Sequence, residues 1–333
     1  MHPLSRRFVP RARPLQRIGR RRLGPGLLLL PLLAWACGEP AAPPPPAAPA
    51  PRREVVAPLS IKTTSYPADW LARRLAPSGA MVSLILPAGE DPPHWQPPGA
   101  LVSSLAEADL IVANGAGFEA WMATAALPEG KLVRAADGVP TIAAASTTHS
   151  HGPAGAHSHG AVDPHTWGDP QTYALQAEAV AAALIRTRPA AETEVKQRLK
   201  ALKTGLTELD GALAAAWAPL TGAKLAANHP SFAYAARRYG LRLHELPLDP
   251  DAPPAPAAVA AAQAWVDSGG QALLWEAQPR PEVLAALPPG LIHVVLDPLE
   301  QPRTEVYDYL GQSRRNIAEL DALVVKLKGT PAP

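Results

Sequence analysis

The chain has 333 residues, of which 47% are hydrophobic and 18% charged, so it can form two domains of ordinary size with buried cores. Residues 1–36 hold eight arginines and no acid, so the formal net charge of +2 becomes −6 for the rest of the chain. This mildly acidic body argues against nucleic acid as a partner.

The first 36 residues predict a signal peptide. An arginine-rich stretch precedes the apolar run "GLLLLPLLAWA", which is short and interrupted by proline, and then comes Cys37, the only cysteine. The sequence "LLAWACG" resembles a bacterial lipobox, although Trp35, just before Ala36, departs from the small residue usual there. We expect export, by the Sec or twin-arginine route, and lipid anchoring at Cys37 on the periplasmic or cell-surface side of a bacterial membrane.

Residues 37–53 predict a tether between this anchor and the rest of the chain. Most of the segment reads "GEPAAPPPPAAPAPRR". Such a proline-rich segment favours an extended polyproline conformation. We therefore expect it to hold a globular body away from the membrane.

From residue 54 onward, apolar β-rich segments alternate with Ala- and Leu-rich helical segments, which predicts parallel sheets. The first four candidate strands are residues 55–61, 81–87, 108–115 and 130–135. The second four are residues 223–228, 241–248, 271–277 and 292–299. The expected fold is α/β, with two similar lobes that each contain a mostly parallel sheet. The N-terminal lobe spans residues 54–188 and the C-terminal lobe residues 219–333.

A long helix is predicted between the lobes, over residues 189–218. Pro189 suits a first helical turn. An apolar stripe follows with spacings of three and four residues. Its members are Val195, Leu199, Leu202, Leu206, Leu209, Leu213 and Trp217. We interpret this as one helix that packs on the body and joins the lobes.

Four residues in loops stand out as candidate metal ligands. They are His94, His165, His229 and Asp297. Three of them follow or end a predicted strand, where open α/β sheets bind ligands, and each lies close to a proline. Three imidazoles and one carboxylate suit Zn²⁺. The spacing of these residues matches no local metal motif.

Five segments carry a resemblance to a known family. They read "LPAGEDPPHWQPP", "VDPHTWGDPQ", "NHPSFAYAARRYGL", "LLWEAQP" and "VLDPL", and they occur in the family's order between about residues 55 and 325. The chain thereby resembles the metal-binding receptors of ABC importers, the cluster A-I solute-binding proteins of the zinc-uptake (ZnuA-like) type. In "EDPPHWQPP" two prolines precede the histidine where one is usual.

The resemblance implies two α/β lobes joined by a long helix, with the metal in the cleft between them. It implies metal-ligand roles for His94, His165, His229 and Asp297. His229 stands where manganese receptors of this family typically have a carboxylate, which favours zinc. Glu276, in "LWEAQP", is a possible outer-shell residue that orients a ligand histidine. The fourth zinc position remains open between Asp297, Glu276 and water.

A histidine-rich loop is expected over residues 147–160. Its histidines are His149, His151, His157 and His159. The Gly- and Pro-rich setting predicts no rigid geometry, so these imidazoles would bind zinc weakly and exchange it fast. A dispensable insert is the alternative.

The expected function is an extracytoplasmic receptor that captures Zn²⁺ and delivers it to the membrane permease of an ABC importer, which works with a cytoplasmic ATPase. The resemblance implies a monomer. A manganese or iron receptor of the same transporter class is the near alternative. A surface adhesin and a zinc hydrolase are alternatives of other classes, but the chain has no H-E-x-x-H motif and Asp297 would fill the open zinc position, so no enzyme activity is expected.

Overall fold

The computed structural model describes residues 57–144, 149–150, 156–157, 162–302 and 306–329. The predicted signal peptide and tether, with Cys37, lie outside the described residues, as do His151 and His159. No helix within the described residues is both long enough and apolar enough to cross a membrane.

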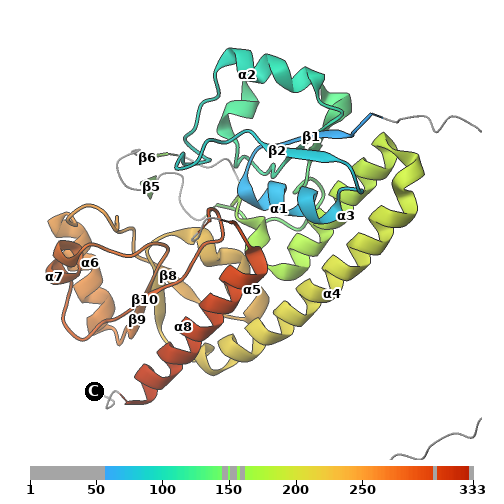
Figure 1. Ribbon diagram of the computed structural model, residues 1–333. Helices are drawn as coiled ribbons and strands as arrows, with labels where there is room; N and C mark the ends of the chain where they lie inside the picture. The colour runs from blue at the N-terminus through green and yellow to red at the C-terminus, as the bar shows by residue number, and fades with distance from the viewer. Residues whose placement is uncertain (1–56, 145–148, 151–155, 158–161, 303–305, 330–333) are drawn as a thin grey trace, which may run out of the picture. The chain divides into compact units, whose positions relative to one another are not determined.

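Two four-stranded parallel sheets organise the chain, as predicted (Figure 1). The first has the order β2-β1-β3-β4 and contains Ser60–Thr63 (β1), Met81–Leu84 (β2), Leu110–Ala113 (β3) and Leu132–Arg134 (β4). The second has the order β10-β9-β7-β8 and contains Leu225–Ala227 (β7), Leu243–Glu245 (β8), Ala272–Trp275 (β9) and Ile292–Val295 (β10). Seven of the eight predicted segments contain one of these strands, and the first, residues 55–61, overlaps β1 only at Ser60 and Ile61.

Burial along the strands follows their place in the sheets. Every residue of the central strands β3 and β9 is buried, as expected for strands covered by helices on both faces. The first strand begins later than predicted, at Ser60 rather than at residue 55. Pro58 has no backbone N–H to donate to a neighbouring strand, which limits pairing before this point.

Eight α-helices surround the sheets in the described part of the chain. They are Tyr66–Leu75 (α1), Gly99–Ser104 (α2), Pro170–Thr187 (α3), Glu192–Trp217 (α4), Ala233–Tyr239 (α5), Pro256–Asp267 (α6), Pro281–Ala286 (α7) and Tyr309–Gly329 (α8). Asp169 caps α3 by accepting a hydrogen bond from the Gln171 backbone N–H, and Pro170 occupies its first turn. Gly240 ends α5 with φ +70°, a left-handed conformation that glycine adopts without strain.

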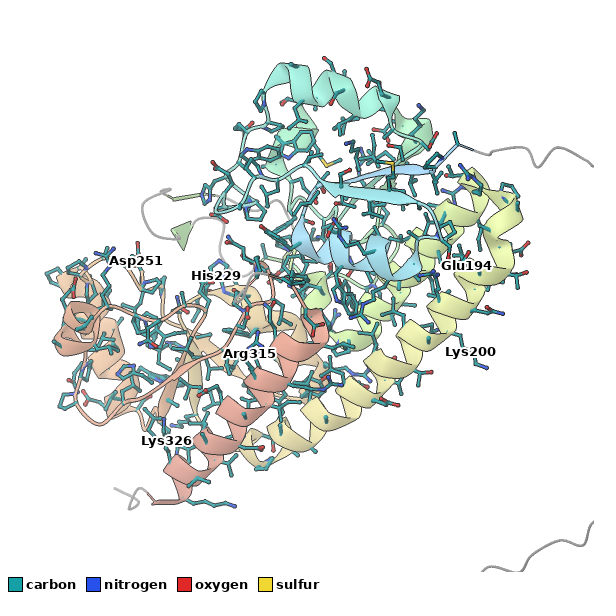
Figure 2. The ribbon with its side chains drawn as sticks, in the orientation of Figure 1. Glu194, Lys200, His229, Asp251, Arg315 and Lys326 are labelled. Atoms are coloured by element: carbon teal, nitrogen blue, oxygen red, sulfur yellow. The ribbon has the colours of Figure 1, made fainter. Side chains whose placement is uncertain are left out.

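The long helix between the sheets is α4, preceded by a 3₁₀ turn at Pro189–Ala191. Its predicted apolar stripe is buried, apart from Leu199, which is partly buried. The helix packs against α1, α3 and α8. Lys200 lies on its exposed face (Figure 2).

One continuous core joins the two sheets. It includes Ile61 and Val112 of the first sheet, Leu225 and Leu274 of the second, and the stripe of α4. The stripe therefore contributes to the packing of both lobes, and this continuity was not evident in the sequence.

The predicted histidine-rich loop contains a short hairpin that the sequence analysis did not predict. Strands β5 (His149–Ser150) and β6 (Ala156–His157) pair antiparallel, with His149 opposite His157. Just outside the loop, Ala143 and Val162 form an antiparallel bridge.

Candidate metal centre

The second sheet reverses its winding direction between β7 and β9, and two predicted site residues follow these strands. His229 comes just after β7, and Glu276 directly after β9. Such a switch point opens a crevice at the carboxyl ends of the strands. Nδ1 of His229 lies 2.9 Å from Oε2 of Glu276 and 2.5 Å from Oγ of Ser231. The Ser231 hydroxyl also donates to Glu276 at 2.9 Å, so these two residues together orient the buried imidazole.

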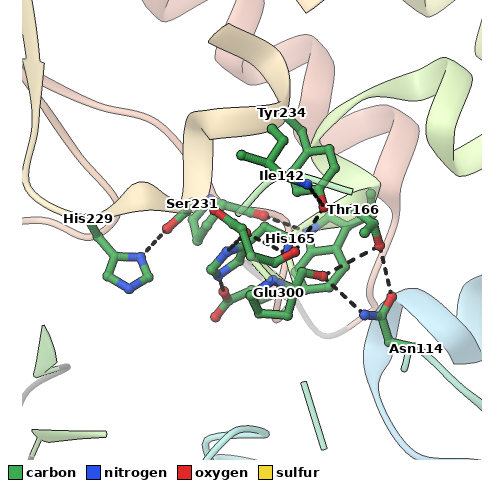
Figure 3. A network of polar contacts seen from close by, with 12 residues as sticks. Asn114, Ile142, His165, Thr166, His229, Ser231, Tyr234 and Glu300 are labelled. Atoms are coloured by element: carbon green, nitrogen blue, oxygen red, sulfur yellow. Dashed lines mark hydrogen bonds and ion pairs between the residues drawn. The ribbon is translucent and has the colours of Figure 1, made fainter. Parts of the chain in front are cut away.

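His165 lies in the loop before α3 and is buried between two carboxylates (Figure 3). Oδ1 of Asp163 accepts the His165 backbone N–H at 2.9 Å and lies 2.7 Å from its Nδ1. On the other side of the ring, Nε2 lies 2.8 Å from Oε1 of Glu300. Asp163 thereby sets the orientation of the imidazole, and Glu300 faces its second nitrogen.

The two carboxylates change the charge state of His165. Burial lowers the pKa of His165, but Asp163 and Glu300 outweigh burial and raise the pKa to about 10. Burial raises the pKa of Asp163, but the ion pair with His165 outweighs burial and brings the pKa below its ordinary value. The two carboxylates thus favour the charged form of the His165 imidazole.

The carboxyl end of β3 supports the His165 loop. Asn114 follows this strand, and its Nδ2 donates to the Pro164 carbonyl at 3.1 Å. Its Oδ1 accepts from Nε2 of Gln176 at 3.0 Å and from Oγ1 of Thr166 at 3.4 Å. The amide groups of Asn114 and Gln176 are buried with the loop, so the loop is held from the first sheet and from α3.

His165 and His229 meet although they belong to different lobes. Their ring centroids are 5.3 Å apart and the ring planes stand at 85°. Both side chains are almost wholly buried. The structure thus brings together two of the four predicted ligands, each with its Nδ1 beside a carboxylate.

His94 lies in the loop after β2 and is more exposed. Its Nδ1 lies 2.5 Å from Oδ2 of Asp91, and 18% of its side chain is accessible. The backbone N–H groups of His94 and Trp95 both donate to the Asp91 carbonyl, at 3.0 and 2.9 Å. Trp95 anchors the loop by burying its indole edge-on against Trp121.

Asp297, the predicted carboxylate ligand, is tied to the turn after β10 and to α8. Its Oδ1 accepts from the Leu299 backbone N–H, and its Oδ2 from Nε2 of Gln312, both at 2.8 Å. Asn316 also accepts from the Asp297 backbone N–H and donates to its carbonyl. These contacts position the turn that leads to Glu300.

That turn is strained and is held from both lobes. Leu299 has φ +64°, a left-handed conformation that costs a bulky residue about 1–3 kcal/mol. The Trp167 indole donates to the Pro298 carbonyl at 2.9 Å, and the Tyr307 hydroxyl donates to the Leu299 carbonyl at 2.7 Å. Glu300 therefore reaches His165 by way of a turn whose conformation its surroundings impose.

Three carboxylates of this region, Asp91, Asp163 and Glu300, were not predicted from the sequence. A signal was present for two of them, because Asp91 and Asp163 precede their histidines by three and two residues. Among the residues that the structure describes, no three or more His, Cys, Asp or Glu side chains have the arrangement of a metal centre. The set of His94, His165, His229 and Asp297 therefore stays a prediction, as does the orienting role of Glu276.

The two histidines inside strands have other surroundings. The His244 ring of β8 stacks on Trp265, with centroids 4.4 Å apart. Nε1 of Trp275 donates to Nδ1 of His293 at 3.1 Å, and burial lowers the pKa of His293. Both contacts suit structural histidines.

Comparisons with known proteins agree with the resemblance described above. A family model described as the periplasmic component A of the zinc-uptake complex matches residues 61–323. A putative metal-binding protein of Thermotoga maritima is 29% identical over 187 residues, which cover 55% of this chain and 62% of that protein. The zinc-binding lipoprotein AdcA of Streptococcus pneumoniae is 25% identical over 279 residues, which cover 80% of this chain and 55% of AdcA.

Solved structures show the same fold. The crystal structure of Zn(II)-bound AdcA from S. pneumoniae has a TM-score of 0.68 at 23% identity, over 83% of this chain and 59% of AdcA. The solute-binding protein FpvC from Pseudomonas aeruginosa, in complex with Mn²⁺, has a TM-score of 0.63 at 20% identity, over 81% of this chain and 98% of FpvC. The chain thus spans about three fifths of the length of the first of these relatives.

Proposed function

The chain belongs to the family of periplasmic component A proteins of zinc-uptake complexes, and we propose that it captures Zn²⁺ outside the cytoplasm and delivers it to the permease of an ABC importer. The cytoplasmic ATPase of that importer would drive transport. The ion is cargo, so the site has to bind it and also release it.

The meeting of His165 and His229 carries this proposal. Metal-ligating histidines typically place one ring nitrogen against a carboxylate, which fixes the ring and raises the basicity of the other nitrogen. His94, His165 and His229 each have this arrangement, with Asp91, Asp163 and Glu276 beside Nδ1. We propose that Nε2 of each of the three histidines is a ligand of the ion.

For the fourth ligand the geometry favours Glu300 over Asp297. The carboxylate of Glu300 lies 2.8 Å from Nε2 of His165, so a cation held between them would have both groups as ligands. Both oxygens of Asp297 accept hydrogen bonds that hold the neighbouring turn. We propose Glu300 as the carboxylate ligand and Asp297 as the residue that supports its turn.

The donor set also supports zinc over manganese. Three imidazoles and one carboxylate match zinc, whereas Mn²⁺ prefers more oxygen donors. The name of AdcA specifies zinc binding, while FpvC was solved with Mn²⁺, so a manganese or iron receptor is the second candidate.

We further propose that the protein acts as an exported lipoprotein anchored at Cys37, as a monomer and without enzymatic activity. The relative AdcA carries the word lipoprotein in its name, and "LLAWACG" supports the same location here. An adhesin would retain its function after loss of metal binding, and a zinc hydrolase would turn over ester or peptide substrates.

Metal competition tests the function directly. Protein stripped of metal is titrated with Zn²⁺ against a chelator of known affinity, and then with Mn²⁺ and Fe²⁺ under the same conditions. We expect one tight site per chain that prefers Zn²⁺, and restored growth in low zinc when the gene returns to a deletion strain. Tight binding of Mn²⁺ with weak binding of Zn²⁺ would favour the second candidate, and no tight binding of any of them would overturn the proposal.

A further inference from the structure

A buried hydroxyl of the second lobe contacts the His165 loop of the first. Tyr234 of α5 is fully buried, and its hydroxyl donates to the Asp163 carbonyl at 2.9 Å. The same oxygen accepts the Ile142 backbone N–H at 3.2 Å (Figure 3). Asp163 in turn donates its own N–H to the Ile142 carbonyl at 2.8 Å. One phenol thereby holds two chain segments that lie side by side.

A second residue of α5 strengthens this contact. Arg237 lies one helical turn after Tyr234, and its guanidinium donates to the carbonyls of Pro140 and Thr141 at 3.1 and 3.2 Å. The guanidinium carbon also lies 4.9 Å from the centre of the Tyr234 ring. Together the two side chains fasten α5 to residues 140–142, before the histidine-rich loop, and to Asp163, after it.

These contacts connect the supports of two candidate ligands. Asp163, which Tyr234 holds by its carbonyl, places its carboxylate on His165. At the other end, Tyr234 lies three residues after Ser231, whose hydroxyl contacts Nδ1 of His229. One chain of contacts from His165 to His229 therefore runs through Asp163, the hydroxyl of Tyr234 and the chain between Tyr234 and Ser231.

We propose that Tyr234 is a positioning residue, which sets the separation of His165 and His229 by fixing Asp163 against α5. This inference rests on the proposed function, because it assigns Tyr234 a role in metal affinity. Metal ligands have to be held within about 0.5 Å of their working geometry by the residues behind them. Loss of the hydroxyl would leave the buried Asp163 carbonyl and the partly buried Ile142 N–H without this partner, and Asp163 would shift to satisfy them.

The test compares Tyr234→Phe with a matched variant, Tyr173→Phe. Tyr173 is also fully buried, and its hydroxyl also donates to a backbone carbonyl, that of Pro67 at 2.7 Å, but it contacts neither histidine support. Both variants keep the ring and lose one buried hydroxyl. Zn²⁺ affinity is measured by chelator competition, and the visible absorption of bound Co²⁺ reports ligand geometry.

We expect Tyr234→Phe to weaken Zn²⁺ binding by about tenfold or more and to shift the Co²⁺ bands, as loss of an outer-shell partner does. Tyr173→Phe should lower the melting temperature by a similar amount and leave affinity and spectrum at wild-type values. Unchanged affinity and spectrum in Tyr234→Phe would overturn the inference, and so would equal losses in both variants.

Two further arms separate the possible failures. If wild-type protein binds no Zn²⁺, the proposed function itself is wrong. If wild-type protein binds Zn²⁺ and Tyr234→Phe binds it equally well, only the positioning role is wrong. Should Tyr234→Phe fail to fold, Arg237→Met replaces it, since Arg237 is exposed and its loss loosens the same contact. It should weaken Zn²⁺ binding and shift the Co²⁺ bands in the same direction by a smaller amount, and wild-type values in Arg237→Met would overturn the inference.

Discussion

The two candidate ligands His165 and His229 differ from the third, His94, in how deeply their side chains are buried. The side chains of His165 and His229 are 1% and 2% exposed, and each is oriented by buried partners from its own lobe. The His94 side chain is 18% exposed, and the Asp91 carboxylate beside it is 26% exposed.

This difference divides the proposed site into a buried part, formed by His165 and His229, and a more exposed part at His94. Binding an ion between His165 and His229 requires little ordering of side chains, because hydrogen bonds and packing already hold them. The more exposed His94 loop would have to be ordered around the ion. For the proposed receptor, such a division would let the exposed side loosen on release of the ion while the buried side stays in place.

The largest expected effect follows removal of one member of the buried pair. His229→Ala should weaken Zn²⁺ binding by more than about 100-fold, because loss of an outer-shell partner alone costs about 10–100-fold. His94→Ala should cost less, since ordering its loop offsets part of what the ligand contributes. Chelator competition measures both affinities. A greater loss in His94→Ala than in His229→Ala would reverse the comparison.

The next effect distinguishes the two carboxylates after β10. Glu300→Gln should weaken Zn²⁺ binding by more than about tenfold, because it removes the charge that faces His165. Asp297→Asn should weaken Zn²⁺ binding less than Glu300→Gln does, through the turn that Asp297 supports, and should lower the free energy of unfolding by about 1–3 kcal/mol, because the amide has one acceptor oxygen for two donors. Zinc titration and urea unfolding of both variants provide the measurement. The opposite pattern would make Asp297 the ligand.

A smaller effect compares the carboxylates behind the histidines. Asp163→Asn should reduce Zn²⁺ affinity by about 10–100-fold, because Asp163 is buried and binds both the backbone and the ring of His165. Asp91→Asn should reduce it by less than about tenfold, since water can replace this partly exposed group. The Zn²⁺ affinities of Asp163→Asn and Asp91→Asn, measured under the same conditions, test this difference. Equal losses would mean that burial of the support makes no difference.

The smallest effect lies away from the site and serves as a control for stability. Asp210 of α4 accepts hydrogen bonds from Arg238 and Tyr239 of α5 and from Gln171 of α3. Asp210→Asn should lower the free energy of unfolding by about 1–2 kcal/mol at neutral pH without changing Zn²⁺ affinity.

The pH dependence of this control follows from the pKa of Asp210. Burial raises this pKa, but the bonds from Arg238 and Tyr239 outweigh burial and bring it below 3.8. The contribution to stability is therefore full above about pH 4 and is lost as pH falls through the lower pKa of the folded state. Urea unfolding at several pH values should show the free energies of unfolding of wild type and Asp210→Asn converging in acid. A difference between these free energies that widens in acid would contradict this assignment.

Much of the architecture could be predicted from local patterns. Seven of the eight apolar segments contain a strand and the first overlaps one, and the stripe from Val195 to Trp217 forms the buried face of one helix. Such periodicities are properties of neighbouring residues, so they can be recognised without knowledge of the fold. The predicted first strand began too early, because the start of this strand depends on Pro58, which has no backbone N–H for strand pairing, and not on hydrophobicity alone.

The sequence by itself determined which histidines follow strands, and family resemblance assigned them to one site. Only the tertiary structure decided that Asp163 and Glu300 lie on either side of His165, that Asp297 serves a turn, and that Tyr234 connects the two lobes. These contacts join residues from separate elements or depend on a strained turn at Leu299. No local pattern encodes them, because each depends on how whole strands and helices pack.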